Sequence, residues 1–316
     1  MAIKIIGTGS KLPSRLVSNQ QLSTFLDTSD EWITSKTGIK TRAILTETIT
    51  TMAAQAAEAA ISNSGLKDGD IDMIICSTIS PDYITPSMAC AVAQQLNLTC
   101  PAFDINAACT GFIYALDTAH AFISSGKVNN ILIIAAENMS RLVDWQDRAS
   151  CVLFGDGAAA CVVTGGESLK YIRLSCEPQV APLYMKFPNG NSPFDDEKNT
   201  PTYLQMEGPQ VYKFAVKTIE KEILCALSSL NMAASDVDYF ILHQANERII
   251  EGARTRLKLP AEKFPMNISK YGNMSAASIP VLLHEMVADG RIKAGTLCMM
   301  IGFGAGMTAG TAVMTW

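Results

Sequence analysis

One cysteine stands out as a candidate nucleophile. Cys109 follows the segment DINAA and opens the run TGFIYALDTAHAFI, which has the pattern of a helix with small residues at its entrance. A thiol at a helix N-terminus lies near free backbone N–H groups and the positive end of the helix dipole, so its pKa is expected to fall. We therefore predict a nucleophile that reacts as the thiolate. The competing interpretation is a small buried side chain that fills space.

His243 is the strongest of three histidines for work on a substrate. It ends the apolar run DYFIL and is followed by the polar sequence QAN. Ligand sites gather at the carboxyl ends of parallel strands, although a satisfied core histidine is the equally simple alternative. His120 and His284 lie inside helical patterns and are interpreted as helix side chains.

Two further segments are able to complete such a site. Asn273 lies in YGNMSAAS, a Gly-Asn turn that opens a helical pattern, although asparagine is common in turns. The C-terminal GFGAGMTAG offers closely spaced backbone N–H groups for an oxyanion, or is simply a tight turn. It is neither a P-loop nor a dinucleotide-binding loop, because it lacks the Gly-Lys-Ser/Thr ending and the strict G-x-G-x-x-G spacing.

The elements that position these residues alternate between strand and helix, as in an α/β protein with buried parallel strands. Their order repeats at an offset of about 166 residues: segment 51–65 leads into DIDMIIC (70–76), and segment 211–230 leads into DVDYFIL (236–242). We predict two pseudo-duplicated βα halves. Residues 1–165 carry the cysteine, and 166–316 carry the histidine and the asparagine. Chance similarity between βα units is the alternative.

Composition restricts the class of protein. Of the 316 residues, 48% are hydrophobic and 17% charged, which favours a large core and leaves apolar surface for a homodimer. The net charge of −5 argues against a nucleic-acid partner, and the lack of a long apolar window or signal-like start argues against membrane or secretion. Nine cysteines without a C-x-x-C pair predict reduced thiols in the cytoplasm and no metal site.

Six segments then resemble one family in order and spacing: TSDEWITSKTGI (28–39), DINAACTGF (104–112), FGDGAAA (154–160), HQANERI (243–249), YGNMSAAS (271–278) and GFGAGMTAG (302–310). From end to end, the chain resembles the β-ketoacyl-acyl-carrier-protein synthase III family of condensing enzymes. The resemblance implies a thiolase-like fold layered α-β-α-β-α. It also implies an acyltransferase that joins an acyl-CoA primer to malonyl-acyl carrier protein, releases CO2 and CoA, and initiates fatty acid synthesis. No cofactor is implied, since the CoA thioester is a substrate.

The resemblance assigns roles to the candidate residues. Cys109 is acylated by the primer, and His243 and Asn273 hydrogen-bond the thioester oxygen of the malonyl unit as it becomes an enolate. The backbone N–H groups of Cys109 and of the loop at Ala305 and Gly306 hold the oxyanion of the acylation step.

The resemblance also implies binding residues for the two substrates. For coenzyme A it implies Trp32 stacking on adenine, Arg148 near phosphate, Asn246 on the pantetheine arm, and Lys36 and Thr37 beside them. For the carrier protein it implies the run Gln244, Ala245, Asn246, Glu247 and Arg248, with the arginine meeting the acidic partner. Without the motifs, these side chains are more simply interpreted as an aromatic over the core and a solvated face.

Some positions depart from the family pattern. Lys36 stands where arginine is usual, so Trp32 is expected to lose a planar partner and coenzyme A to bind less tightly. Ala305 replaces a usual glycine, and its added methyl group either narrows the oxyanion site or is harmless. Thr85 and Met88, in ITPSMAC, are expected at the primer pocket in place of a large aromatic, which predicts acceptance of primers longer than acetyl.

Two other functions stay open. A related acyltransferase or a condensing enzyme of a secondary-metabolite pathway can use the same acyl-cysteine. A silent partner that only binds carrier protein is expected to lack one of Cys109, His243 and Asn273, and all three are present. Plain acyl transfer has no use for Asn273, because it involves no decarboxylation.

Overall fold

Two β-sheets form the frame of the protein. The structure is a computed structural model that describes residues 2–187, 194 and 202–316. The larger sheet has the strand order β1 (Ile3–Lys11), β7 (Asp156–Gly165), β6 (Asn130–Asn138), β4 (Met73–Ser77) and β5 (Ala102–Ile105). The smaller sheet has the order β8 (Leu169–Gln179), β13 (Gly306–Thr315), β12 (Leu297–Gly304) and β11 (Tyr239–Leu242).

The two sheets repeat one topology. β4 pairs in parallel with β6, and β7 runs antiparallel between β6 and β1. In the other sheet β11 pairs in parallel with β12, and β13 runs antiparallel between β12 and β8. This confirms the predicted fold class of two pseudo-duplicated α/β halves. Their division at residue 165 stays a prediction, although β7 ends at Gly165 and β8 begins at Leu169 in the other sheet.

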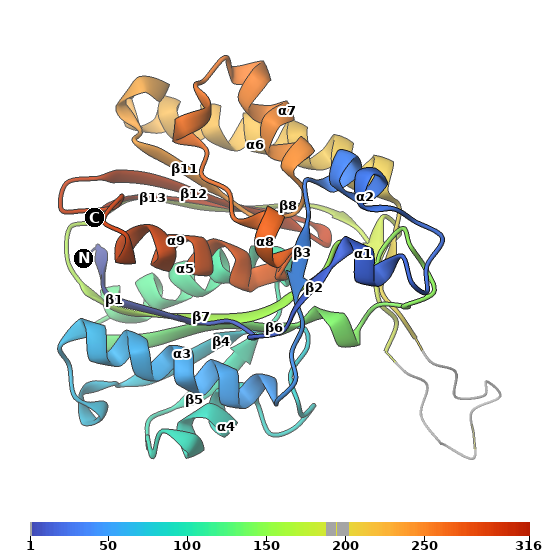
Figure 1. Cartoon of the computed structure of the whole chain (residues 1–316). Coiled ribbons are helices and arrows are strands. Elements are labelled where there is room, and N and C mark those ends of the chain that lie inside the picture. Colours follow the sequence, from blue (N-terminus) through green and yellow to red (C-terminus); the bar gives the residue numbers. More distant parts are fainter. Residues whose placement is uncertain (1, 188–193, 195–201) are drawn as a thin grey trace.

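Helices form the remaining three layers (Figure 1). α5 (Gly111–Ser124) and α9 (Ser278–Ala288) lie side by side between the sheets. α3 (Ile49–Ser64) and α4 (Met88–Gln95) pack on the outer face of the larger sheet, and α6 (Gly208–Leu230) and α7 (Glu247–Leu257) on that of the smaller one. The layers are therefore α-β-α-β-α, as predicted. No helix in the described part of the chain is long and apolar enough to cross a membrane.

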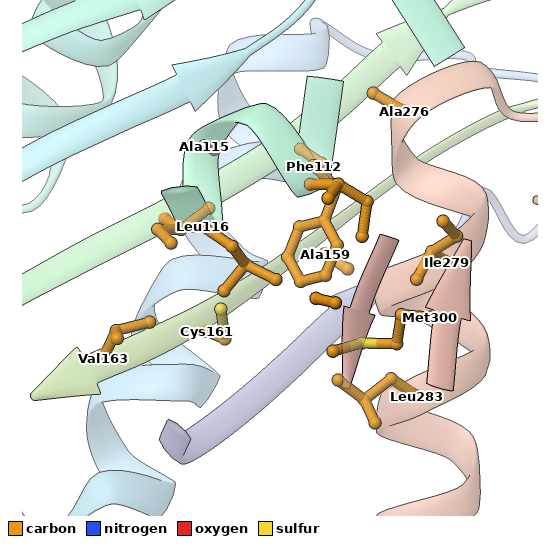
Figure 2. Packing of buried hydrophobic residues seen from close by; sticks show 14 of the residues in the cluster. Phe112, Ala115, Leu116, Ala159, Cys161, Val163, Ala276, Ile279, Leu283 and Met300 are labelled. Carbon is orange, nitrogen blue, oxygen red and sulfur yellow. The ribbon is translucent and has the colours of Figure 1, made fainter. Parts of the chain in front are cut away.

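The central layer explains why the sequences of α5 and α9 are apolar on most sides. Figure 2 shows Phe112 of α5 between Leu116 of the same helix and Ile279 of α9, with Cys161 of β7 below Leu116 and Met300 of β12 below Ile279. Because both helices are covered by a sheet on each side, few of their positions need polar residues. Burial of these side chains holds the two halves together, at roughly 25 cal/mol for each Å² of apolar surface.

Smaller elements connect and cover the layers: β2 (Leu16–Ser18), α1 (Asn19–Leu22), α2 (Asp30–Thr37), β3 (Thr41–Ala43), β9 (Leu183–Tyr184), β10 (Gln205–Met206) and α8 (Ile268–Tyr271). Arg42 of β3 is fully buried and donates to the Asn19 side chain at 2.6 Å and to the Val152 carbonyl at 3.1 Å. It ties the segment that carries α1 and α2 to the body of the protein.

A matching tight corner precedes each central helix. The 3-10 helix η2 (Ala108–Thr110) leads into α5, and η6 (Ser275–Ala277) leads into α9. Ala108 has a φ of 46° and Ser275 a φ of 48°, in the left-handed region that non-glycine residues rarely occupy. Such strain costs about 1–3 kcal/mol for each residue and clusters at functional sites. As predicted, Cys109 and the Asn273–Ser275 turn begin equivalent helices.

Candidate active site

The three residues predicted to act on substrate line one cavity of about 120 Å³. Cys109 comes from η2, His243 from the loop after β11, and Asn273 from the turn after α8. All three are at most 7% exposed. Most of the other lining residues are apolar, so a group inside the cavity is shielded from water.

Cys109 is tightly packed at its corner. A Cβ added to Gly304 would lie 2.8 Å from the Cβ of Cys109 and 3.0 Å from its backbone nitrogen, so only glycine fits at this approach. Burial raises the pKa of the Cys109 thiol to about 12; the Ser275 hydroxyl lowers it and the charge of Glu137 raises it. The expected low pKa is therefore wrong for the free protein, because loss of water outweighs the helix end. The thiol must lose its proton as it attacks.

His243 is held as a neutral imidazole. Its backbone N–H donates to the Ile301 carbonyl at 2.9 Å, which continues the pairing of β11 with β12. The ring meets that of Phe303 edge-on, with centroids 5.2 Å apart. Burial lowers the pKa of His243 to about 3, so the ring is uncharged at neutral pH. A neutral imidazole is able to donate one hydrogen bond but is a poor base.

Asn273 is fixed by its backbone and by one end of its side chain. Its N–H donates to the Leu153 carbonyl at 2.9 Å, and its carbonyl accepts from Gly155 at 3.0 Å. The side-chain oxygen accepts the backbone N–H of Ser275 at 2.8 Å. The amide oxygen is thereby used within the turn, and the amide N–H groups are the donors that remain for a ligand.

The glycine-rich loop lies against the thiol. Gly304 and Ala305 line the cavity, whereas Gly306 does not; its carbonyl accepts from the Cys176 thiol at 3.3 Å. The Ala305 carbonyl accepts from the Thr308 hydroxyl at 3.1 Å, which orients this turn. The structure thus brings the backbone of Cys109 and the Gly304–Ala305 step together. The assignment of an oxyanion site to these groups stays a prediction.

The residues predicted for coenzyme A gather in two places. The guanidinium of Arg148 lies over the ring of Trp32, 5.3 Å from its centre. Asn246 donates to the Lys36 carbonyl at 3.1 Å, which joins α2 to α7. Of the five predicted residues, Asn246 lines the cavity. Thr37 is buried and uses its hydroxyl inside its own helix, where it donates to the Ile33 carbonyl at 2.7 Å.

This arrangement corrects one expectation. Lysine at position 36 was expected to leave Trp32 without a planar partner, but Arg148 supplies one. Its guanidinium is also paired with the Asp27 carboxylate at 3.1 Å. A planar cation is therefore already in place beside the indole, and exposed Lys36 is not needed for stacking.

The predicted carrier-protein run is only partly at the surface. Arg248 is exposed at the start of α7, and Asn246 caps that helix by accepting its backbone N–H at 2.8 Å. Gln244 is 0% exposed and bonds to backbone groups on both sides, so its predicted contact with a carrier protein is wrong. Ala245 lines the cavity, and Glu247 is half-buried against α2.

The two residues predicted for the primer pocket do not line the cavity in this chain. Met88 is 1% exposed and packs in the core between α4 and the larger sheet, with its backbone N–H bonded to Asp104 at 2.6 Å. Thr85 is exposed. The sequence of a buried strand-to-helix segment does not show which of its side chains face the core and which face a pocket. Met88, which fills the core, was therefore predicted to line the primer pocket.

Sequence reasoning missed most of the apolar lining. Five of these residues come from the stretch around β9 and β10 and from the start of α6: Leu183, Leu204, Met206, Tyr212 and Phe214. The signal available was the number of large apolar residues in a stretch with little regular pattern. Large apolar side chains outside the main core elements often line a binding pocket.

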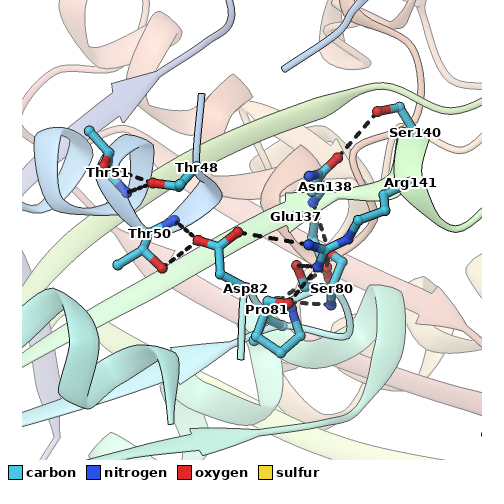
Figure 3. Close-up of polar contacts among 11 residues, drawn as sticks. Thr48, Thr50, Thr51, Ser80, Pro81, Asp82, Glu137, Asn138, Ser140 and Arg141 are labelled. Carbon is cyan, nitrogen blue, oxygen red and sulfur yellow. Dashed lines mark hydrogen bonds and ion pairs between the residues drawn. The ribbon is translucent and has the colours of Figure 1, made fainter. Parts of the chain in front are cut away.

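Sequence reasoning also missed a buried acid. Glu137 is the next-to-last residue of the apolar strand β6 and is 0% exposed. One of its oxygens accepts from the Ser80 hydroxyl at 2.5 Å and the Ile79 N–H at 3.1 Å, in the cluster drawn in Figure 3. Burial raises the pKa of Glu137 to about 7, while these bonds lower it. The signal was a charged residue at the carboxyl end of a strand, which is the rule that singled out His243.

Comparison with known proteins gives consistent matches. The family model described as 3-oxoacyl-[acyl-carrier-protein] synthase III matches residues 103–177, and the model of its C-terminal part matches 227–316. A β-ketoacyl-[acyl-carrier-protein] synthase III of Clostridium acetobutylicum is 42% identical, covering 100% of this chain and 99% of its own. The protein of that name from Aquifex aeolicus is 44% identical, covering 100% of both chains.

Solved structures agree with these matches. The crystal structure of the Aquifex aeolicus synthase III has a TM-score of 0.92 at 44% identity and covers 99% of this chain and 100% of its own. The priming β-ketosynthase of a polyketide biosynthetic pathway has a TM-score of 0.92 at 32% identity, covering 99% of this chain and 96% of its own.

Proposed function

The chain belongs to the 3-oxoacyl-[acyl-carrier-protein] synthase III family, and from that premise we propose that it condenses an acyl-CoA primer with malonyl-acyl carrier protein. The products are 3-oxoacyl-acyl carrier protein, CO2 and CoA, and the reaction initiates fatty acid synthesis. One observation carries the proposal: Cys109, His243 and Asn273, from three distant segments, line the same buried cavity.

In the first half-reaction Cys109 takes the acyl group. Its sulfur attacks the thioester carbonyl, a new S–C bond forms, and CoA leaves as a thiolate that is protonated by water. The negative charge on the carbonyl oxygen falls near the Cys109 N–H and the Gly304–Ala305 step, where backbone donors stabilise it. Apolar walls strengthen these hydrogen bonds because they exclude water.

In the second half-reaction the malonyl unit loses CO2. His243, neutral through burial and with its proton on the nitrogen that faces the substrate, and the N–H groups of Asn273 hydrogen-bond the thioester oxygen. Electrons from the breaking C–C bond move into this oxygen as an enolate, so no strong base is needed. The resulting carbanion attacks the acyl group on Cys109 and releases the thiolate.

The lining supports primers longer than acetyl. Leu183, Leu204 and Met206 present aliphatic side chains to the cavity that Cys109 also lines, and such side chains are suited to an alkyl chain. We expect acylation by isobutyryl- and octanoyl-CoA within about tenfold of the rate with acetyl-CoA, since each tenfold step corresponds to about 1.4 kcal/mol. A strong preference for acetyl-CoA is the contrary result.

The setting of the enzyme is also part of the proposal. Trp32, Arg148 and Asn246 are assigned to coenzyme A, and exposed Arg248 to the acidic carrier protein. A homodimer is favoured by exposed apolar side chains in one loop, where Tyr83 is 55% and Ile84 81% exposed. All nine cysteines are free, which is typical of the reducing cytoplasm.

The decisive test uses labelled acyl-CoA. The protein is incubated with it, digested and mapped, and malonyl-acyl carrier protein is then added while CO2 release is measured. The expected label is on Cys109, and Cys109→Ser is expected to take up none. A label on another residue, or acyl transfer without CO2, contradicts the proposal.

A second function differs in the pathway rather than the chemistry. The 32% identical polyketide-priming neighbour has the same fold, so a secondary-metabolite condensing enzyme is the nearest alternative. Turnover with the carrier protein of fatty acid synthesis, compared with that of a polyketide system, separates the two.

A further inference from the structure

Buried polar atoms without a hydrogen-bond partner gather around the nucleophile. In the described part of the chain, eight such side-chain atoms are found. Half of them lie here, namely Ser77 Oγ, Glu137 Oε1, His243 Nδ1 and Ser275 Oγ. Buried polar groups are nearly always paired, so a cluster of exceptions calls for a functional reason.

Glu137 presents one fixed oxygen and one open oxygen. Oε2 accepts from the Ser80 hydroxyl at 2.5 Å and from the Ile79 N–H at 3.1 Å. The Ser80 hydroxyl is itself fixed, because it accepts the Asn138 N–H at 2.7 Å (Figure 3). Oε1 is buried and makes no hydrogen bond. The carboxylate is thus held in place through Oε2, whereas Oε1 is able to accept a proton.

Ser275 lies on η6, which packs against both η2, where Cys109 lies, and β6, where Glu137 lies. It is 0% exposed and sits at the left-handed corner that opens α9. Its hydroxyl lies close enough to lower the pKa of both Cys109 and Glu137, although it makes no hydrogen bond of normal geometry to either. A hydroxyl both donates and accepts, so it is suited to pass a proton between two groups that do not touch.

We propose that Glu137 accepts the proton of Cys109 through the hydroxyl of Ser275 during acylation, and returns it at the end of the cycle. As sulfur attacks the thioester, the S–H proton moves to Ser275 Oγ while the Ser275 proton moves to Glu137 Oε1. The acid stays protonated while the acyl group occupies sulfur. When condensation releases the Cys109 thiolate, the proton returns along the same path, so each turnover leaves both groups as they began. This inference rests on the proposed function.

Glu137 is better suited to this task than His243. The pKa of His243 is about 3, whereas that of Glu137 is about 7, so the carboxylate is the stronger base in the cavity region near neutral pH. An ionised Glu137 raises the pKa of the Cys109 thiol, because two negative charges in one apolar site are unfavourable. Moving the thiol proton to Glu137 neutralises the acid as the sulfur attacks, and so avoids this repulsion. Among the described residues, Cys76 on β4 also faces Glu137, and burial raises its pKa well above the usual value. The charged Arg141 lies beside this cluster and donates to the Ser80 carbonyl at 3.1 Å.

The test is the pH profile of a single acylation. Wild-type protein is mixed with excess acetyl-CoA between pH 5.5 and 9, and acylation of Cys109 is followed by intact mass. The wild-type rate is expected to rise with pH around a midpoint near 7 and then level off, following ionisation of Glu137. Glu137→Gln and Ser275→Ala are expected to slow acylation about 100-fold and to lack this midpoint. Exposed Glu58→Gln and Ser62→Ala are the matched controls.

A third variant separates proton transfer from a packing role. Ser80→Ala removes a bond that lowers the pKa of Glu137, so its midpoint is expected to move upward by about one pH unit. This variant also decides the matter if Glu137→Gln does not fold. A wild-type midpoint in Glu137→Gln, or an unmoved midpoint in Ser80→Ala, overturns the inference.

Decarboxylation provides the internal reference. CO2 release from malonyl-acyl carrier protein depends on His243 and Asn273 and is expected to stay within about threefold of wild type in Glu137→Gln, a difference well under 1.4 kcal/mol. Equal loss of acylation and decarboxylation assigns Glu137 to general structure and overturns the relay. If wild-type Cys109 takes no acyl group at all, the proposed function itself fails, which is a separate result.

Discussion

The guanidinium of Arg148 lies over the indole of Trp32, with its carbon 5.3 Å from the ring centre. The pair joins two segments far apart in the sequence, and it restores the planar stacking that lysine at position 36 does not provide. A planar base entering beside the indole meets a positive charge that is already positioned. We therefore expect the adenine end of coenzyme A to be recognised here.

Trp32→Ala is expected to raise KM for acyl-CoA about tenfold with little change in kcat, because a stacking or cation–π contact contributes on the order of 1–2 kcal/mol of binding remote from the reacting carbonyl. Steady-state kinetics with acyl-CoA varied measures this. Phe25→Ala, which removes a 59% exposed aromatic outside the cavity, is the control. An unchanged KM in Trp32→Ala removes the indole from the binding site.

Asn273→Ala is expected to keep acylation of Cys109 and to slow decarboxylation at least about 100-fold, since it removes donors to the developing enolate. Intact mass gives the first rate and CO2 release the second. Exposed Asn129→Ala serves as the control. Loss of both activities to the same extent contradicts the division of roles between Cys109 and Asn273.

Gly304→Ala places a methyl group 2.8 Å from the Cβ of Cys109 and is expected to slow acylation about 100-fold, because a displacement of about 1 Å at a reacting group has this effect. Thermal unfolding accompanies the acylation assay to check that the variant folds. Gly69→Ala, where an added Cβ meets open space, is the control. Acylation at the wild-type rate in Gly304→Ala argues that the corner is loosely packed.

Glu137→Gln is expected to change how stability depends on pH. The pKa of Glu137 is raised in the folded protein from 4.5 to about 7, so the stabilisation is fully present below pH 4.5 and is lost as pH rises from 4.5 to about 7. The shift from the usual 4.5 corresponds to about 3 kcal/mol. Relative to wild type, the variant should therefore gain about 3 kcal/mol between pH 5 and pH 8.5 in denaturant unfolding. A constant difference across this range shows that Glu137 is not the titrating group.

Position along the chain predicted the main features of fold and site. The carboxyl end of a parallel strand identified His243, and the strand-turn-helix pattern identified Cys109. Both rules describe where backbone geometry must place a residue, so they hold without knowledge of the partners. The repeated order of elements likewise predicted two sheets with the same topology, which the structure confirms.

Features that depend on burial by segments distant in the sequence were not predicted. The pKa of Cys109 rises because the surrounding layers exclude water, and nothing in its neighbouring sequence reports that burial. Met88 and Gln244 were misplaced for the same reason, since each is buried by segments distant in sequence. Glu137 was overlooked although its position at the end of β6 follows the rule that identified His243.

Part of the aliphatic wall of the cavity comes from the short β9–β10 pair and from Leu204 just before β10, and this pair belongs to neither main sheet. A combinatorial library at Leu183, Leu204 and Met206 can therefore resize the acyl chamber while the interlocked sheets stay intact. We expect the preference for acyl chain length to change, in evolution or by engineering, through substitutions at these three residues rather than through changes in the two main sheets.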